Sequence, residues 1–329
     1  MRWPFPVLVA DIGGTNARFA LLTAPDAALS PVVRLATGDH AGFAEAVEAA
    51  VAAQRWPRPQ SVLIGAAGAV HARSVHLTNA DWQIDGPALA DRLGLAQGML
   101  LNDFETLALA LPALQPGDLS PIGGGCVRPG VRLVIGPGTG LGVGALVEAG
   151  DRLLPLSSEG GHIALATAGD AERRLLDTLT PGGGRLPAEV LLAGPGLGRL
   201  MQALAPGRPA ADYAPAAILA AAGAGQDPAA VQAVGLWLRF LARFCGDMAL
   251  TFMASGGVFL AGGILPRLGP LINAAVFRQA FADNATHRSL LETIPVRLIK
   301  GPDPALTGLA ALARTPQRYH LDYAGRLWR

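Results

Sequence analysis

Short apolar runs alternate along the chain with longer segments in which apolar residues recur every three to four positions. The short runs are rich in valine, isoleucine and leucine, which is typical of buried strands. The longer segments are rich in alanine and leucine, which favour helices. This repeated alternation predicts an α/β fold.

The predicted strands cover residues 7–10, 17–22, 31–36, 61–66, 75–78, 98–101, 132–136, 142–147, 152–156, 257–261 and 295–299. The predicted helices cover residues 41–54, 87–93, 104–111, 171–179, 188–193, 197–204, 214–222, 228–254 and 304–314. Residues 115–130 are rich in turn-forming residues, and we expect them to connect two halves of the chain.

One early segment resembles a later one. Residues 7–22 (VLVADIGGTNARFALL) and 133–147 (LVIGPGTGLGVGALV) each predict a strand, a turn with glycine and threonine, and a second strand. Aligning Gly14 with Gly138 gives an offset of 124 residues. Two glycine-rich hairpins can also look alike by chance, so the repeat is a prediction for the fold to test.

The composition excludes several classes of protein. Of the 329 residues, 51% are hydrophobic and 16% are charged, which is typical of a globular chain and not of a disordered one. A net charge of +1 leaves no positive excess for phosphate backbones, so no nucleic-acid partner is expected. The only lysine is Lys300, outside any G-K-[ST] motif. P-loop enzymes and protein kinases need a lysine at the phosphates, so both are excluded.

The cysteines and the apolar stretches indicate where in the cell the protein is expected. Cys126 and Cys245 are too few for a disulfide framework or a thiolate zinc site. We expect both to be buried and reduced, which favours a cytoplasmic location. The apolar run before Asp11 is too short for a signal peptide. The stretch 231–265 is interrupted by charged residues such as Arg243, so it predicts a buried helix and a strand, with no membrane partner.

The first candidate site is D-I-G-G-T-N, in which a strand delivers Asp11 to a tight turn. The N–H groups of Gly13 and Gly14 can approach a phosphate because no Cβ blocks them, and Thr15 and Asn16 add further donors. The Asp11 carboxylate suits Mg²⁺, held through water. An ordinary hairpin turn is the alternative. A Rossmann site is disfavoured because the chain returns as a strand.

The second candidate site is G-P-G-T-G-L-G, residues 136–142. Gly138 and Gly140 offer the same close approach of backbone N–H groups, and Thr139 adds a hydroxyl. Two neutral loops of this kind can clamp a polyphosphate without a lysine. A simple turn is again the alternative, although a hairpin does not need four glycines in seven residues.

The third candidate site is L-L-N-D-F-E, residues 100–105. Asp103 follows a predicted strand and opens a predicted helix. It is either a helix N-cap, a role that aspartate fills well, or a general base at the carboxyl end of a strand, where α/β proteins bind ligands.

The fourth candidate site is S-S-E-G-G-H, residues 157–162, together with Glu189. Glu159 and His162 flank a glycine pair, so we expect them on one loop. Carboxylates and imidazole suit a polyhydroxylated sugar, because each hydroxyl both donates and accepts hydrogen bonds. A metal site would be short of ligands, and Glu189 alone could be a solvated helix residue.

The fifth candidate site is G-G-V-F-L-A-G-G-I-L-P-R, residues 256–267. A buried strand, 258–261, runs into Gly262 and Gly263 and then into a helix. Paired glycines at that point let a flat group such as an adenine lie on the backbone. Close packing of strand and helix is the alternative.

These five motifs, in this order and spacing, resemble those of bacterial glucokinases, which belong to the hexokinase-type, actin-like ATPase superfamily. The similarity runs from about Val9 to about Ala313, and LNDF, GPGTGLGVG, SEGGH, AGPGL and GGVFLAGGILPR carry it. It implies ATP-dependent phosphorylation of glucose at the 6-hydroxyl. It also implies an α/β, two-domain actin-like ATPase (ribonuclease H-like) fold with an interdomain cleft, its small domain at 1–112 plus 303–329 and its large domain at 113–302.

The resemblance also implies roles for individual residues and for partners. Asp103 would be the general base, and Asp11 would hold Mg²⁺ through water. Glucose would be bound by Asn79, Asn102, Asp103, Glu159, His162 and Glu189. ATP would be bound by Asp11, Gly13, Gly14, Thr15, Asn16, Gly138, Thr139, Gly140, Gly262 and Gly263. The family commonly forms homodimers.

The chain departs from the family pattern at three points. Ser158 stands where the family usually has a glycine, and we expect it to perturb that loop. The tail 314–329 runs past the usual end of the family, and its role is open. Two cysteines cannot make the zinc motif of the related repressor/open-reading-frame/kinase family. Two other functions stay open: a kinase for mannose, fructose or an amino sugar, and a non-catalytic sugar sensor.

Overall fold

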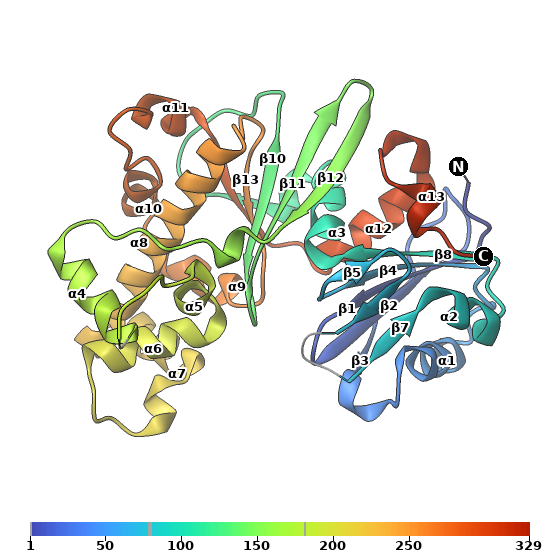
Figure 1. Cartoon of the computed structure of the whole chain (residues 1–329), viewed down its shortest axis with the longest axis horizontal. Coiled ribbons are helices and arrows are strands. Elements are labelled where there is room, and N and C mark those ends of the chain that lie inside the picture. Colours follow the sequence, from blue (N-terminus) through green and yellow to red (C-terminus); the bar gives the residue numbers. More distant parts are fainter. Residues whose placement is uncertain (1, 78–80, 181) are drawn as a thin grey trace. The chain divides into compact units, whose positions relative to one another are not determined.

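The structure, a computed structural model, describes residues 2–77, 81–180 and 182–329 of the chain. Its residues form two compact units (Figure 1). The first unit takes in the chain up to Pro116, Leu146–Ser157 and Gly301–Arg329. The second takes in Gly117–Ala145 and Ser158–Lys300.

The first unit is built on a five-stranded sheet in the order β3-β2-β1-β4-β8. The strands are β1 (Val7–Ile12), β2 (Asn16–Leu22), β3 (Val33–Ala36), β4 (Ser61–Ala66) and β8 (Gln97–Asn102). β2 is antiparallel to β1 and β3, whereas β1, β4 and β8 are parallel. The parallel strands are almost continuously apolar because both faces of the sheet are covered. A small antiparallel sheet joins β5 (Val70–His71), β6 (Ser74–His76) and β7 (Gln83–Asp85).

Helices cover both faces of this sheet. They are α1 (Phe43–Gln54), α2 (Gly86–Leu93), α3 (Asp103–Ala110), α12 (Pro304–Arg314) and α13 (Tyr323–Arg326). Leu8, Ala10 and Ile12 of β1 share a core cluster with Phe43 of α1 and Leu89 of α2. On the other face α12 packs against α3, β1 and β4 (Figure 1).

The second unit holds most of a six-stranded sheet in the order β12-β11-β10-β13-β14-β9. The strands are β9 (Leu119–Pro121), β10 (Arg132–Pro137), β11 (Leu141–Ala149), β12 (Arg152–Ser158), β13 (Gly257–Leu260) and β14 (Val296–Ile299). β10, β13 and β14 are parallel, and β9 is antiparallel to β14.

The core of the second unit forms around the long helix α8 (Pro228–Thr251). Asp227 caps this helix by accepting hydrogen bonds from the N–H groups of Ala229 and Ala230. Trp237 is fully buried, and its indole N–H donates to the carbonyl of Leu191 at 2.9 Å. The other helices are α4 (Asp170–Leu179), α5 (Ala188–Leu192), α6 (Gly194–Leu204), α7 (Pro215–Ala224), α9 (Leu265–Leu268), α10 (Ala274–Phe281) and α11 (Arg288–Thr293).

The internal repeat is confirmed at the level of topology. The order β3-β2-β1-β4-β8 in the first sheet matches β12-β11-β10-β13-β14 in the second. In each sheet a three-residue loop joins the first two strands of the repeat: 13–15 after Ile12, and 138–140 after Pro137. Aligning the two strand ends gives an offset of 125 residues, so the predicted offset of 124 was short by one.

Three expectations about the fold need correction. The expected connection 115–130 contains a strand, β9, which pairs with the edge of β14 and so depends on a partner far along the chain. Helices α10, α11 and α13 were not predicted. The expected large domain included residues 146–157, which the structure groups with the first unit. The N–H of His320, in the same unit, donates to the carbonyl of Leu153 at 2.9 Å.

The cysteines and the apolar helices can also be compared with expectation. Cys245 is buried, and burial raises the pKa of its thiol. Cys126 is exposed, so the expectation that both are buried was wrong for it. Among the described residues, no helix is sufficiently long and apolar to cross a membrane.

Candidate functional site

The first unit brings its predicted site residues to one edge of its sheet. Asp11 pairs with Gly65 of β4, and Ala66 of β4 pairs with Asn102 of β8. Because these strands are parallel, Asp11 and Asn102 lie at the same carboxyl edge, two strands apart. With a strand spacing near 4.8 Å, their backbones are about 10 Å apart. That edge is where α/β sheets bind ligands.

Asp11 belongs to a chain of alternating charges. Its Oδ2 lies 2.6 Å from Nη1 of Arg18, and Nε of Arg18 lies 3.5 Å from Oδ1 of Asp303. Arg34 forms a further ion pair with Asp303. Burial raises the pKa of Asp11, and the Arg18 guanidinium opposes that rise. Arg18 therefore favours the ionised carboxylate in a place where burial disfavours it.

The loop after Asp11 is held by its backbone. The N–H of Gly13 donates to the carbonyl of Asn16 at 3.0 Å, and the Thr37 hydroxyl donates to the carbonyl of Gly14 at 2.9 Å. Thr15 and Asn16 are exposed, and the Asn16 amide donates to the Thr15 hydroxyl at 3.0 Å. The motif is thus a rigid turn that presents polar side chains to solvent.

The start of α3 tests the N-cap interpretation of Asp103. Asn102 is the N-cap, and its Oδ1 accepts from the N–H groups of Phe104 and Glu105 at 2.9 and 3.4 Å. Asp103 is the first residue of the helix, so the N-cap alternative for Asp103 was wrong. The side-chain oxygen of Asn102 is committed to the helix, and its Nδ2 donates to the carbonyl of Gly68 at 3.4 Å.

The second unit gathers its own candidate residues around the loop 138–140. The N–H of Gly138 donates to the carbonyl of Gly140, and the N–H of Gly194 donates to the carbonyl of Gly138, both at 2.8 Å. Glu189, the second residue of α5, accepts from the N–H of Leu141 through Oε2 at 2.9 Å. Glu189 is therefore no solvated helix residue. It supports the loop expected to hold phosphates.

The loop with Glu159 and His162 is more open. The two side chains are 87% and 58% exposed, with Oε2 and Nε2 3.6 Å apart. A Cβ at Gly161 would lie 1.9 Å from the carbonyl oxygen of Leu141, so this position needs glycine. The Ser158 hydroxyl accepts from the N–H of Gly160 at 3.0 Å and so stabilises the turn.

Gly262 and Gly263 follow β13 and are exposed. A Cβ at Gly262 would lie 2.3 Å from the carbonyl oxygen of Pro137, and its φ of +122° is a glycine conformation. Gly263 faces open space, with no atom within 4 Å of a Cβ built there. Gly262 is therefore required by its close contact with the end of β10, whereas Gly263 has open space beside it.

Each unit brings its own candidates together. In the first, Asp11, Gly13–Asn16, Asn102 and Asp103 share one sheet edge. In the second, Gly138–Gly140, Glu159, His162, Glu189, Gly262 and Gly263 lie around the end of β10. Asn79 lies outside the described residues.

Two further groups were missed. Arg18 could have been found as a charged residue facing Asp11 across a hairpin. Glu105 could have been found as the third residue after an Asn N-cap, which is a capping-box signal.

The donor set can be tested against Mg²⁺. Among the described residues no group of three or more His, Cys, Asp and Glu side chains could hold a metal ion. Mg²⁺ bound to a nucleotide needs no such cage, because phosphates and waters supply most ligands and one or two carboxylates complete the set. Asp11, a part-buried carboxylate at the sheet edge, fits that requirement.

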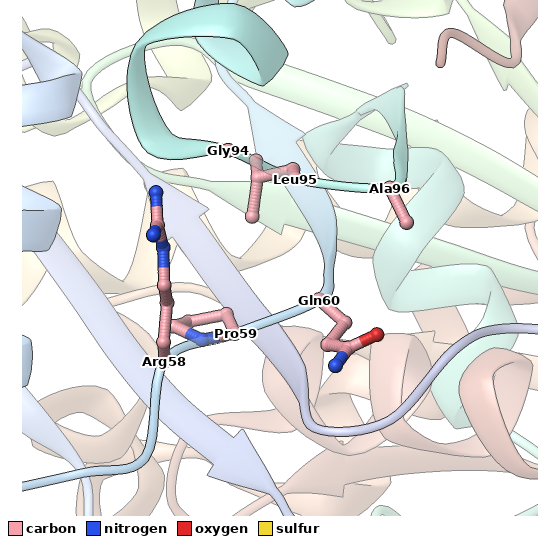
Figure 2. A pocket seen from close by; sticks show the side chains of 6 residues that line it. All are labelled: Arg58, Pro59, Gln60, Gly94, Leu95 and Ala96. Atoms are coloured by element: carbon pink, nitrogen blue, oxygen red, sulfur yellow. The ribbon is translucent and has the colours of Figure 1, made fainter.

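A hollow at the opposite edge of the first sheet does not belong to this site. Figure 2 shows it lined by residues that precede β4 and β8: Arg58, Pro59, Gln60, Gly94, Leu95 and Ala96. Nε and Nη2 of Arg58 donate to the carbonyl of Leu93 at 3.1 and 2.9 Å, which satisfies the end of α2. The hollow is explained by helix capping.

The chain has clear relatives. The glucokinase family model matches residues 8–316. A glucokinase of Rhizobium meliloti is 42% identical over 330 residues, covering 99% of this chain and 97% of that protein. A solved glucokinase from an Antarctic psychrotroph is 31% identical, with a TM-score of 0.82, over 94% of this chain and 99% of its own. A ROK family glucokinase from Streptomyces griseus, in complex with glucose and AMPPNP, shares the fold at 24% identity, with a TM-score of 0.63, over 94% of this chain and 99% of its own.

Proposed function

The chain belongs to the glucokinase family, and we propose that it transfers the γ-phosphoryl group of ATP to the 6-hydroxyl of glucose. Its fold is the two-domain actin-like ATPase fold, as the resemblance implied. The observation that carries the proposal is the position of Asp103, at the first residue of α3 and on the sheet edge that also holds Asp11.

Asp103 is proposed as the general base. The glucose oxygen forms a bond to the γ-phosphorus while the bond from that phosphorus to the β,γ-bridging oxygen breaks, and ADP leaves. The proton of the hydroxyl passes to the Asp103 carboxylate. Phosphoryl transfer otherwise requires positioning and neutralisation of charge; the loops would supply the positioning, and Mg²⁺ would supply the neutralisation.

The two glycine loops are proposed to hold the polyphosphate. The N–H groups of Gly13 and Gly138 already donate to the carbonyls of Asn16 and Gly140. Other backbone N–H groups of 13–16 and 138–140, with the hydroxyl of Thr139, can donate to phosphate oxygens, because glycine leaves the backbone accessible. Gly262 and Gly263 are proposed to border the adenosine. The Streptomyces protein was crystallised with AMPPNP, an analogue of ATP, which supports ATP as the donor.

Mg²⁺ is proposed as the metal, held by the phosphates and by Asp11 through water. When bound, it neutralises charge that develops on the phosphates. Asp11 can do its part only when ionised, and the ion pair with Arg18 favours that state. The Asp11 carboxylate can accept a hydrogen bond from a water bound to the metal. The neighbouring Arg18 guanidinium offsets the charge of this carboxylate and so limits the net charge of the site.

The sugar is proposed to be bound by Asn102, Asp103, Glu159, His162 and Glu189, with Asn79 from the sequence resemblance alone. A buried polar group left unpaired by the wrong sugar costs about 1–3 kcal/mol, which is the basis of selectivity. The carboxylates should also repel acidic sugars.

The test is ADP formation with ATP, Mg²⁺ and a panel of sugars, comparing the wild-type chain with Asp103→Asn. We expect the highest kcat/KM with glucose and a loss of most of kcat in the variant. Higher kcat/KM with mannose, fructose or an amino sugar would identify that sugar as the substrate. Sugar binding without ADP formation would identify a sensor.

We also propose a cytoplasmic location and a homodimer, both of which rest on the family resemblance. A mass of about 67 kDa, twice the 33.7 kDa of one chain, is expected from light scattering on a size-exclusion column. A mass of one chain at micromolar concentration would contradict the dimer.

A further inference from the structure

The C-terminal tail packs back onto the first unit. Tyr319 and Trp328 are 2% and 1% exposed. Gly98 and Trp328 exchange two backbone hydrogen bonds of 3.1 Å. A Cβ at Gly86 or Gly98 would lie within 2.5 Å of the Trp328 ring, so both glycines leave room for it. The tail beyond α12 is therefore an integral part of this unit (Figure 1).

Arg326 of this tail forms an ion pair with the buried carboxylate of Glu105. Its Nη1 lies 2.7 Å from Oε1 and 2.9 Å from Oε2 of Glu105. The Glu105 side chain is 4% exposed, whereas that of Arg326 is 28% exposed. The two residues are 221 positions apart in the chain. A buried carboxylate needs such a partner, because it has lost the water that solvated it.

Glu105 in turn holds the start of α3. Its Oε2 accepts from the backbone N–H of Asn102 at 3.3 Å, while Oδ1 of Asn102 accepts from the N–H of Glu105. This reciprocal pair is a capping box, and Asp103 lies inside it. A shift in the capping box moves the backbone of Asp103 directly.

We propose that Arg326 is a positioning residue for Asp103: by orienting both oxygens of Glu105 it keeps the capping box closed and fixes the backbone from 102 to 105. The functional part of this inference rests on the proposed function, in which Asp103 is the base. The tail then has a role in the reaction.

The charges around Glu105 determine how its protonation, and with it the capping box, depends on pH. Burial raises the pKa of Glu105, and Arg326 opposes the rise. Of the elements packed against α3, β4 and β8 carry no ionisable side chain. α12 carries Arg314, whose guanidinium donates to the carbonyls of Pro25 and Ala27. Asp103 is the other ionisable group on α3 itself.

Removal of the Arg326 charge therefore raises the pKa of Glu105 further. At a pH below this raised pKa the carboxyl is protonated, and a neutral acceptor binds the Asn102 N–H less strongly than a carboxylate does. Activity should then fall as the pH is lowered through the new pKa, and it should recover as the pH rises.

The experiment compares Arg326→Met, Arg326→Lys and the double variant Arg326→Met/Glu105→Gln with wild type. Steady-state kinetics from pH 5.5 to 9 and amide hydrogen exchange of residues 101–107 are measured. The matched control is Arg318→Met, which removes the same charge from an exposed arginine of the tail.

For Arg326→Met we expect kcat at pH 7 to fall about tenfold, because small displacements of a catalytic group have effects of at least this size. KM for glucose and for MgATP should stay within about twofold. The loss should deepen at low pH, and amide exchange at 101–107 should be faster. Both contacts to Glu105 come from the single nitrogen Nη1, and lysine keeps a charged nitrogen donor, so Arg326→Lys should return kcat to within about threefold. In the double variant the added pH dependence should disappear.

Wild-type kcat in Arg326→Met, or a loss independent of pH, would overturn the proposal and leave a purely structural ion pair. A pH dependence that persists in the double variant would also overturn it. If Arg326→Met does not fold, Arg326→Lys still tests the proposal. We then expect faster amide exchange at 101–107 and a small decrease in kcat at low pH in that variant. Absence of glucose phosphorylation by wild type would contradict the proposed function instead, and the exchange data would still report on the capping box.

Discussion

The loops 13–15 and 138–140 occupy equivalent places in two sheets of the same strand order, yet the protein supports them differently. The first follows Asp11 and stands beside a row of charges that ends at Asp303 and Arg34. The second is held by backbone hydrogen bonds and by Glu189. The two hairpins thus share strand order and loop length, whereas the charges around them differ.

The difference follows from what each unit contributes. An acid that is buried next to the reaction needs a cation to stay ionised. A loop that only donates N–H groups needs no charge, and glycine backbone suffices. In the proposed function, the acids assigned to the metal and to the proton, Asp11 and Asp103, lie in the first unit, whereas both units contribute N–H donors and sugar contacts.

The largest expected effect tests where the reactive acid lies. Asp103→Asn should lower kcat by about 10²–10⁴-fold, the usual range for loss of a general base. Glu189→Gln, the matched acid-to-amide change in the second unit, keeps an acceptor for Leu141 N–H and should mainly raise KM for glucose. Equal losses of kcat in the two variants, each folded by circular dichroism, would break the assignment of roles to the units.

The next effect tests the backbone contact of the second unit. Gly262→Ala should lower the free energy of unfolding by about 1–3 kcal/mol, because a Cβ there meets Pro137 and the backbone conformation is strained. Gly263→Ala is the matched neighbour without a contact, and it should be close to neutral in stability. Urea unfolding measures both, and similar midpoints for the two variants would contradict the difference.

A third effect tests the charged support of the first loop. Arg18→Met removes the cation that opposes the rise in the pKa of Asp11, so that pKa should rise further. A raised carboxyl pKa means protonation at a higher pH, so kcat/KM for MgATP should fall about tenfold near neutrality and recover as the pH increases. The measurement is kcat/KM for MgATP from pH 5.5 to 9. If the decrease on the acidic side occurs at the same pH in Arg18→Met and in wild type, Arg18 does not lower the pKa of Asp11.

The smallest effect asks whether the loops are equivalent toward the nucleotide. Gly13→Ala and Gly138→Ala each add a Cβ that clashes with no protein atom. At Gly138 no atom lies within 4 Å of it, and at Gly13 the carbonyl oxygen of Asn16 lies at an ordinary contact distance of 3.6 Å. Each should raise KM for MgATP about fivefold without a change in Tm, because the methyl group meets only the phosphates. Gly117→Ala, also free of contacts, is the control. An effect in one loop alone would mean that only that loop binds phosphate.

Much of the fold could be predicted from local pattern. The strand 61–66 and the helix 304–314 match the structure residue for residue, because a continuous apolar run and a run of helix-forming residues each specify their element. Strand β9 was missed because it is a three-residue segment that exists only as the partner of β14. The candidate loops could be found from the sequence because close approach of a ligand to the backbone itself requires glycine at these positions.

The sequence by itself determined the α/β class, the repeated hairpin loops and the residues that resemble a glucokinase, because hydrophobic period, glycine and acid positions are local properties. Only the tertiary structure decided what holds those residues. The bonds of Asp303 to Arg18 and Arg34, and that of Arg326 to Glu105, join segments more than 200 residues apart. Such pairs leave no local pattern, since the burial that makes a partner necessary arises only when the chain has folded.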